Sequence, residues 1–157
     1  MSETRKGPFW DMLEGRKPAP PAASLLGFEL VAIDPEAGTI QVRFQGKREF
    51  TNPMGTIQGG FLAAMLDDTL GPALVATLAP NQFAPTIELK VNFIQAARPG
   101  PLRGSGRVIA RRRSIAFLAG ELSSAHARAR ALNRHDGLQR GRTYSRRSGR
   151  RSWAIST

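Results

Sequence analysis

The segment from Phe61 to about Leu78 constrains the fold of this chain more than any other. Its side chains are apolar on nearly every side, which indicates a helix buried inside the molecule rather than one lying on its surface. Pro72 should kink or shorten this helix, because its ring would clash with the carbonyl of Asp68. The proline and the acids Asp67 and Asp68 also argue against a membrane span. We therefore predict one central buried helix.

Segments that alternate apolar and polar residues lie on both sides of this helix. Such alternation is typical of strands with one buried face. The predicted strands are 24–34, 39–45, 86–94, 102–111 and 114–122. Turn residues at 34–38 join the first two strands into a hairpin. The order of elements predicts an α+β fold in which an antiparallel sheet wraps around the central helix.

The first 23 residues precede the predicted sheet. Residues 8–15 are compatible with a short amphipathic helix, and the proline-rich connector that follows, 17–23, cannot be helix interior or central strand. We assign residues 1–122 to one domain, which includes this N-terminal part. No secretory signal and no membrane span are visible, so a cytoplasmic protein is the simplest expectation.

After Leu122 the character of the sequence changes. Residues 123–157 show no sustained period and hold nine arginines against one acid, Asp136. This composition predicts a poorly ordered tail that is dispensable for catalysis. A reading-frame change in a GC-rich gene would produce an arginine-rich sequence of this kind, and an acquired basic arm would have a similar composition.

Composition excludes several kinds of chemistry. There are no cysteines, so disulfides, thiol nucleophiles and cysteine-ligated zinc are ruled out. Both histidines, His126 and His135, lie in the tail, so a metal site or histidine base would have to come from there. Residues 1–122 hold 14 Lys and Arg against 11 Asp and Glu, so the domain itself gives no reason to expect nucleic-acid binding.

Asp67 and Asp68 are the residues that most clearly suggest chemistry. A carboxylate on an apolar helix costs free energy of desolvation unless it is paired or accepts hydrogen bonds. Adjacent helical residues point about 100° apart, so one acid can face a pocket while the other caps or pairs. Alternatively, both form a narrow polar stripe facing solvent. The glycines of 55–60 favour the first interpretation, because they leave amides unshielded at the helix start, where an oxyanion can develop.

The loop Asn-Pro-Met-Gly-Thr-Ile-Gln-Gly-Gly at 52–60, followed by Leu-Asp-Asp at 66–68 and Gly71, resembles the signature of the PaaI-like acyl-CoA thioesterases of the hotdog superfamily. Those proteins carry an N-x-x-G-x-x-H-G-G loop before the central helix and an Asp nine positions after the His. Gln58 occupies the position of that His, and Asp67 lies nine residues further on. The resemblance extends from about Phe9 to Leu122.

The resemblance implies a role for each matching residue. Asp67 matches the general base or nucleophile that acts on the thioester. The backbone N–H of Gly59 would polarise the carbonyl, Asn52 would help to position substrate or water, and Thr86 falls where the family often places a hydroxyl beside the acid. The family forms its site between two subunits, which implies a homodimer or homotetramer. An acyl-CoA substrate is implied, with no cofactor and no metal.

The chain departs from the family at Gln58. An amide can donate a hydrogen bond but cannot hold a proton charge near neutral pH, so Asp67 is left as the only plausible acid–base group of the core. This argues against the hotdog dehydratases, which need a histidine. It also motivates an alternative function, a catalytically weak protein that binds acyl-CoA. The chain also departs from the family after Leu122, where the sequence shows no pattern for the family's last apolar strand.

Arginines supply the remaining candidate contacts. Arg98, Arg111, Arg112 and Arg113 are candidates for binding the phosphates of coenzyme A, although any one of them could be the solvated end of a strand. A third function, association with nucleic acid through the basic tail, ranks last. The tail offers only two stacking groups, Tyr144 and Trp153, and no RNA-binding motif.

Overall fold

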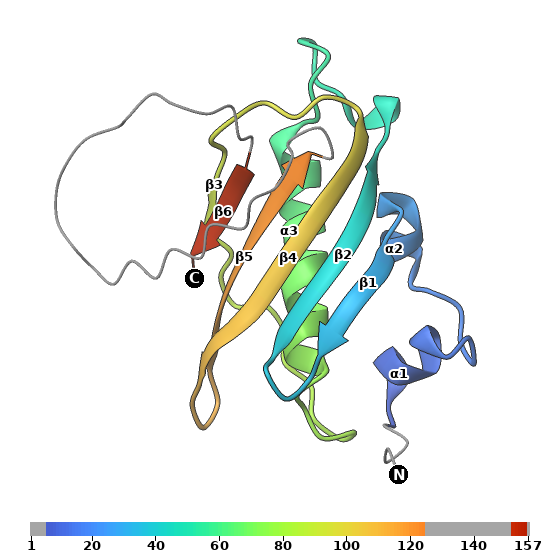
Figure 1. Ribbon diagram of the computed structural model, residues 1–157, viewed down its shortest axis with the longest axis vertical. Helices are drawn as coiled ribbons and strands as arrows, with labels where there is room; N and C mark the ends of the chain where they lie inside the picture. The colour runs from blue at the N-terminus through green and yellow to red at the C-terminus, as the bar shows by residue number, and fades with distance from the viewer. Residues whose placement is uncertain (1–5, 125–151, 157) are drawn as a thin grey trace, which may run out of the picture.

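A six-stranded antiparallel sheet curves around one long helix in the computed structural model, which describes residues 6–124 and 152–156 (Figure 1). The helices are α1 (Pro8–Leu13), α2 (Pro21–Leu26), the 3₁₀ turn η1 (Arg48–Phe50) and the central α3 (Gly59–Val75). The strands are β1 (Glu29–Asp34), β2 (Thr39–Gly46), β3 (Val91–Asn92), β4 (Gly100–Arg111), β5 (Ala116–Ser124) and β6 (Ser152–Ser156). The sheet order is β1-β2-β4-β5-β6-β3. The predicted α+β architecture is therefore confirmed.

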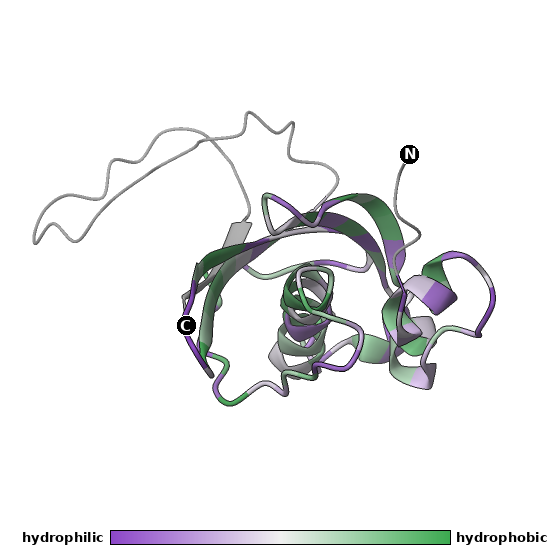
Figure 2. Cartoon of the chain, turned by 90° about the horizontal axis from the view of Figure 1, so that it is seen from below, coloured by the Kyte–Doolittle hydropathy of each residue, from purple (hydrophilic) through white to green (hydrophobic). Residues whose placement is uncertain are grey.

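Figure 2 shows α3 lying within the concave face of the sheet. Strand β2 shows why the sequence folds this way: Ile40, Val42 and Phe44 are buried beneath the sheet, while the residues between them are exposed. The turn before it is fixed by Asp34, whose Oδ1 accepts hydrogen bonds from the backbone N–H groups of Glu36 and Ala37. The predicted hairpin of the first two strands is confirmed.

Three glycines of β4 and β5 let α3 approach the sheet backbone closely. A Cβ atom built on Gly104 would lie 2.5 Å from Oγ1 of Thr69 on α3, and one built on Gly120 would lie 2.9 Å from a methyl carbon of Leu70. A Cβ atom on Gly106, which pairs with Gly120, would lie 3.2 Å from Thr69 and Leu70. The distances at Gly104 and Gly120 are shorter than real Cβ contacts, so the sheet needs glycine at these two positions where the helix crosses it.

The central helix is shorter than the apolar segment that predicts it. It ends at Val75 rather than near Leu78, and Pro72 lies within its last turn. This agrees with the shortening expected from the proline, which removes the hydrogen bond to the carbonyl of Asp68. Its buried residues include Leu62, Met65, Leu66, Thr69, Leu70 and Ala73.

The predicted strand at 24–34 is wrong in its first part, because α2 occupies Pro21–Leu26 and β1 starts only at Glu29. Pro21 stands at the first helical position, where its missing N–H costs nothing. Gly27 ends α2 in the left-handed conformation, with φ 69° and ψ 42°. The predicted proline-rich connector therefore runs into a helix at its end, whereas the helix expected at 8–15 is confirmed as α1.

The predicted strand at 86–94 is confirmed only for Val91 and Asn92, which form β3. A strand needs a neighbour for its backbone groups, and β3 pairs only with β6 among the described residues. Residues 86–90 lie beside no strand in that part of the chain, and the side chain of Ile87 is 82% exposed. Alternation of residue types alone therefore overestimated the length of this strand.

Two short parts of the segment assigned to a poorly ordered tail belong to the sheet. Ser123 and Ser124 still belong to β5, and residues 152–156 form β6, which pairs with β5 on one side and β3 on the other. A segment of five residues is too short to show a period in the sequence, so its pairing depends on the two edges that accept it. Residues 125–151, most of the predicted tail, lie outside the described residues.

Candidate active site

The loop before α3 is held in shape by Asn52. Its Oδ1 accepts hydrogen bonds from the backbone N–H groups of Met54 and Thr56, at 3.0 and 3.2 Å, and its Nδ2 lies 3.0 Å from Oγ1 of Thr56. The backbone N–H of Asn52 donates to the carbonyl of Thr56, which closes the loop. Gly55 stands at the tip with φ 71°. These contacts occupy Asn52 within the loop, so the structure gives it a role in shaping the loop that the sequence did not predict.

The start of α3 presents free backbone amides. Gln58 is the N-cap residue, in an extended conformation, and its side chain makes no capping hydrogen bond. No hydrogen bond to the N–H of Gly59 or Gly60 is found within residues 6–124. The loop is fixed just before this point, because the N–H of Gln58 donates to the carbonyl of Phe50. Two oriented amides at a helix N-terminus suit a developing negative charge.

Asp67 and Thr86 are brought together as the resemblance implied. The hydroxyl of Thr86 donates a hydrogen bond of 2.7 Å to Oδ1 of Asp67. Asp67 is half-buried on α3, and Thr86 lies in the irregular segment that leads from α3 to β3. The hydrogen bond leaves Oδ2 of this carboxylate for other contacts and fixes the orientation of the group.

Asp68 lies in a different environment from its neighbour. Its Oδ2 is buried and has no hydrogen-bond partner in the described part of the chain. Burial and, to a smaller extent, the negative charge of Asp67 together raise the pKa of Asp68 from 3.8 to about 6. The two acids therefore lie in different environments: Asp67 is oriented by a hydroxyl, whereas Asp68 is a desolvated carboxyl. No hydrogen bond or ion pair of the Asp68 side chain is found among the described residues, so the expectation that the second acid caps or pairs is not met there.

Asp67 and the amide of Gly59 are far apart within one chain. A helix rises about 1.5 Å per residue, so Asp67 lies about 12 Å further along α3 than Gly59. An oxyanion donor has to lie about 3 Å from the carbonyl oxygen on which it acts. The two groups of one chain therefore cannot converge on the same small carbonyl.

The ring of Phe93 covers one side of the helix start, which the sequence did not reveal. A Cβ atom built on Gly59 would lie 3.0 Å from the nearest carbon of this ring, which is itself 52% exposed. The strand pattern identified Phe93 only as an apolar position. Its contact with Gly59 depends on how the segment after Thr86 returns along α3.

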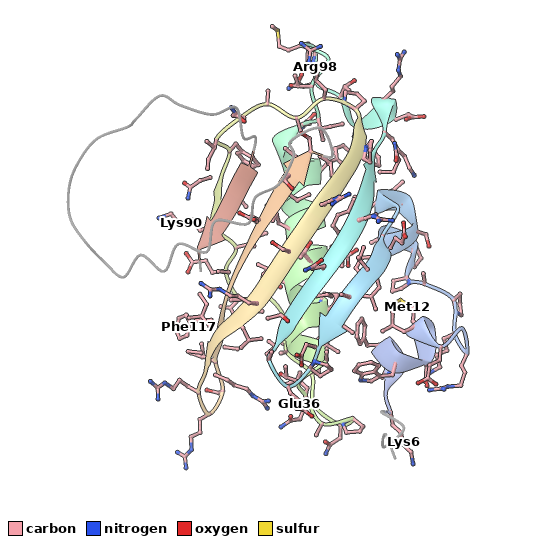
Figure 3. The ribbon with its side chains drawn as sticks, viewed as in Figure 1. Lys6, Met12, Glu36, Lys90, Arg98 and Phe117 are labelled. Atoms are coloured by element: carbon pink, nitrogen blue, oxygen red, sulfur yellow. The ribbon has the colours of Figure 1, made fainter. Side chains whose placement is uncertain are left out.

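The four candidate arginines do not form one cluster. Arg98 precedes β4 and Arg111 ends it, and β4 has 12 residues, which corresponds to about 35 Å. Figure 3 shows Arg98 at one end of the molecule and Phe117, just after the β4–β5 turn, towards the other. Arg98 therefore cannot join the Arg111–Arg113 group on the same phosphates within one chain, and its own phosphate-binding role stays a prediction.

Within that group, Arg111 makes hydrogen bonds inside the protein. Its Nη1 donates to the carbonyl of Thr77 and its Nη2 to Oε1 of Gln82, each at 3.1 Å. No side-chain hydrogen bond of Arg112 or Arg113 is found among the residues described, and both are exposed on the β4–β5 turn. These two arginines keep the phosphate-binding role as a prediction.

Two further features of the described residues bear on chemistry. They contain no group of three or more His, Cys, Asp or Glu side chains placed to hold a metal ion. In the same part of the chain, every helix is too short or too polar to span a bilayer. The two histidines, His126 and His135, lie outside the described residues.

An antiparallel sheet wrapped around one long apolar helix is the architecture of the hotdog fold. Comparison with known proteins agrees: the model of the thioesterase superfamily matches residues 54–131. A crystal structure of a candidate thioesterase from Ralstonia eutropha, described as related to phenylacetic acid degradation, is 31% identical. Its TM-score is 0.76, and the match covers 94% of this chain and 96% of that one. This chain belongs to the thioesterase superfamily.

Two other relatives extend the comparison. A protein named as a candidate esterase from Saccharolobus solfataricus is 34% identical over 82 residues, which is 52% of this chain and 57% of that protein. The chain thus matches little more than half the length of this curated relative. A structure from Streptococcus mutans bound to acetyl CoA has a TM-score of 0.59 and 16% identity, covering 82% of this chain and 84% of that one. At that identity the likeness concerns the fold alone.

Proposed function

We propose that this protein hydrolyses an acyl-CoA thioester to a free carboxylic acid and the thiol of coenzyme A, with Asp67 as the acid–base group or nucleophile. The observation that carries the proposal is the hydrogen bond between Thr86 and Asp67, because it orients a carboxylate on a helix that also presents two free amides. Membership of the thioesterase superfamily supports thioester hydrolysis in general. The choice of coenzyme A as the thiol rests on the resemblance and on the acetyl CoA bound by the relative from Streptococcus mutans.

Asp67 can act in either of two ways. As a general base, its carboxylate takes a proton from water while the water oxygen bonds to the thioester carbon. As a nucleophile, a carboxylate oxygen bonds to that carbon, and water later hydrolyses the resulting anhydride. In both cases the carbonyl electrons move onto oxygen, where the N–H of Gly59 stabilises the charge, and return as the C–S bond breaks. The thiolate then takes up a proton.

The catalytic site requires two copies of the chain. Asp67 and Gly59 of one chain lie about 12 Å apart along α3, so a substrate carbonyl between them needs one group from each of two subunits. A twofold dimer supplies this arrangement twice, because both subunits contribute the same surface. We accordingly propose a homodimer or a dimer of such dimers.

Release of thiol from a panel of short, medium, long and aryl acyl-CoAs tests the activity. Asp67→Asn should lower the rate on the order of a hundredfold or more while leaving the fold intact, because it keeps the volume but removes the acid–base group. Asp68→Asn is the matched control and should retain most of the activity. Near-full activity of Asp67→Asn would show that Asp67 has a structural role only.

Binding without turnover is the alternative that Gln58 favours, because the family histidine is absent. Calorimetric titration with acyl-CoA separates the two functions. If the wild type binds acyl-CoA but releases no thiol from any member of the panel, the protein is a binding protein rather than a hydrolase.

Mixing two inactive variants tests the shared site. Gly59→Pro removes the candidate oxyanion donor, and its fixed backbone angle suits the first residue of a helix that follows an extended Gln58. Its Cβ would press on the ring of Phe93, 3.0 Å away, so Gly59→Ala, which adds the same Cβ but keeps the N–H, is the matched control. A dimer of one Gly59→Pro chain and one Asp67→Asn chain has one site with both defects and one with neither. A mixture of the two should therefore regain about a quarter of the wild-type activity. A mixture that exchanges subunits, as native mass spectrometry would show, but stays inactive would refute the shared site.

A further inference from the structure

Arg111 joins three parts of the fold at the end of α3 that lies far from Gly59. It is the last residue of β4, and its guanidinium donates hydrogen bonds of 3.1 Å to the carbonyl of Thr77 and to Oε1 of Gln82. Thr77 follows directly on the C-cap of α3. The positive charge thus lies at the negative end of the helix dipole, where it is favoured.

Gln82 is held from both sides. Its Oε1 also accepts a hydrogen bond from the backbone N–H of Ala79, and its own N–H donates to the carbonyl of Ala79. The loop after α3 is therefore closed on itself and tied to the end of β4 by a single side chain. Figure 1 shows this loop and the β4–β5 turn at the same end of the molecule.

The loop leads directly to Thr86, four residues after Gln82. Pro85 precedes Thr86, and its ring fixes one backbone angle and favours an extended conformation at Ala84. Only three residues separate the glutamine that Arg111 holds from the hydroxyl that donates to Asp67, and the backbone of two of them is restricted by Pro85. A shift of Gln82 is therefore expected to move Thr86 as well.

We propose that Arg111 is a positioning residue for the reaction: it holds the loop from Thr77 to Gln82 so that the hydroxyl of Thr86 stays on Asp67. This inference rests on the proposed function of Asp67. It also separates Arg111 from Arg112 and Arg113, which have no such hydrogen bonds among the described residues and stay candidates for the phosphates of coenzyme A.

The test compares Arg111→Gln with Arg107→Gln, which removes an exposed arginine of the same strand that makes no side-chain hydrogen bond within residues 6–124. Each is assayed on an acyl-CoA and on the N-acetylcysteamine thioester of the same acyl group, which has no phosphates. Arg111→Gln should lower kcat on both substrates by about three- to tenfold, with KM little changed, as expected for hydrogen bonds from one charged donor. Arg107→Gln should resemble the wild type.

A double variant decides whether Arg111 acts through Thr86. In a Thr86→Val background, Arg111→Gln should cause little further loss of kcat, because the hydroxyl that it positions is already gone. Multiplied losses in the double variant would refute the proposal. A rise in KM for the acyl-CoA alone, with the N-acetylcysteamine thioester unaffected, would show instead that Arg111 binds phosphate.

Hydrogen exchange of the ligand-free protein tests the positioning role of Arg111 without depending on hydrolysis, so it is independent of the test of the proposed function. Arg111→Gln should speed the exchange of the amides of Ala79 and Gln82, and Arg107→Gln should not. If the wild type releases no thiol from either substrate, the proposed function has failed, whatever the exchange shows. If the wild type is active and exchange is unchanged in Arg111→Gln, the positioning role is refuted while the function stands.

Discussion

Replacing Asp68 by asparagine should stabilise the protein at neutral pH. Oδ2 of this carboxyl is buried without a partner, and burial, assisted by the charge of Asp67, raises the pKa of Asp68 from 3.8 to about 6. The folded state therefore binds this proton more tightly than the unfolded state does. The resulting stability is fully present below about pH 4 and is lost as pH rises to about 6. Asparagine has nearly the same shape and stays neutral throughout this range.

The size of the effect follows from the shift. One pKa unit corresponds to about 1.4 kcal/mol, so a shift from 3.8 to about 6 sets an upper limit of about 3 kcal/mol. Asp68 is only half-buried, and solvent screens part of its charge. We therefore expect Asp68→Asn to gain about 1–2 kcal/mol above pH 6 and nothing below pH 4.

Urea unfolding of the wild type and the variant between pH 3.5 and 8, in steps of about half a unit, measures this difference across the whole window. Glu88→Gln is the control, because Glu88 is an exposed carboxylate whose removal should leave the pH dependence nearly unchanged. Two curves that stay parallel over the whole range would refute the reasoning. They would mean that Asp68 is solvated or paired in the folded protein.

Three further predictions concern the packing, the loop and the assembly. Gly104→Ala should destabilise the fold by about 1–3 kcal/mol in urea unfolding, because the added Cβ would lie 2.5 Å from Oγ1 of Thr69; Gly71→Ala, with open space around its Cβ, should be neutral or stabilising. Gln58→His should preserve or raise thioester hydrolysis, since it restores the family residue, and a well-folded variant with sharply reduced turnover would show that the site is built around the amide. Light scattering should find a dimer or larger assembly, and an active monomer at micromolar concentration would contradict the shared site.

The sequence predicted those parts of the molecule that depend on local pattern or fixed spacing. The apolar run around Asp67 identified the central helix because it is long and uniform, and β2 followed from its strict alternation. The pairing of Asp67 with Thr86 came from the resemblance rather than from the pattern, since the two residues are 19 apart in sequence.

Most parts that the sequence missed depend on tertiary contacts. Helix α2 is the exception, because Pro21 at its start and Gly27 at its end are local signals that the apolar pattern of the residues between them obscured. By residue type Arg111 cannot be distinguished from Arg112, but of the two only Arg111 donates hydrogen bonds to Thr77 and Gln82. The length of β3 depends on its pairing with Ala154 and Ile155 of β6, which lies far along the chain and which no pattern near β3 predicts.

The position of β6 between β5 and β3 has a consequence for how the chain folds. Strands β1 and β2, and likewise β4 and β5, form antiparallel hairpins between near neighbours in sequence, so these two hairpins can form early. Joining β2 to β4 and closing the sheet through β6 have to wait for contacts such as Thr39 with Arg107 and Val91 with Ile155, which are each separated by more than sixty residues. Until then β5 and the β3 segment present two unpaired edges at which a second chain could add. We expect refolding to show a late phase that reports on β3 and β6, and losses to aggregation that rise with protein concentration during that phase.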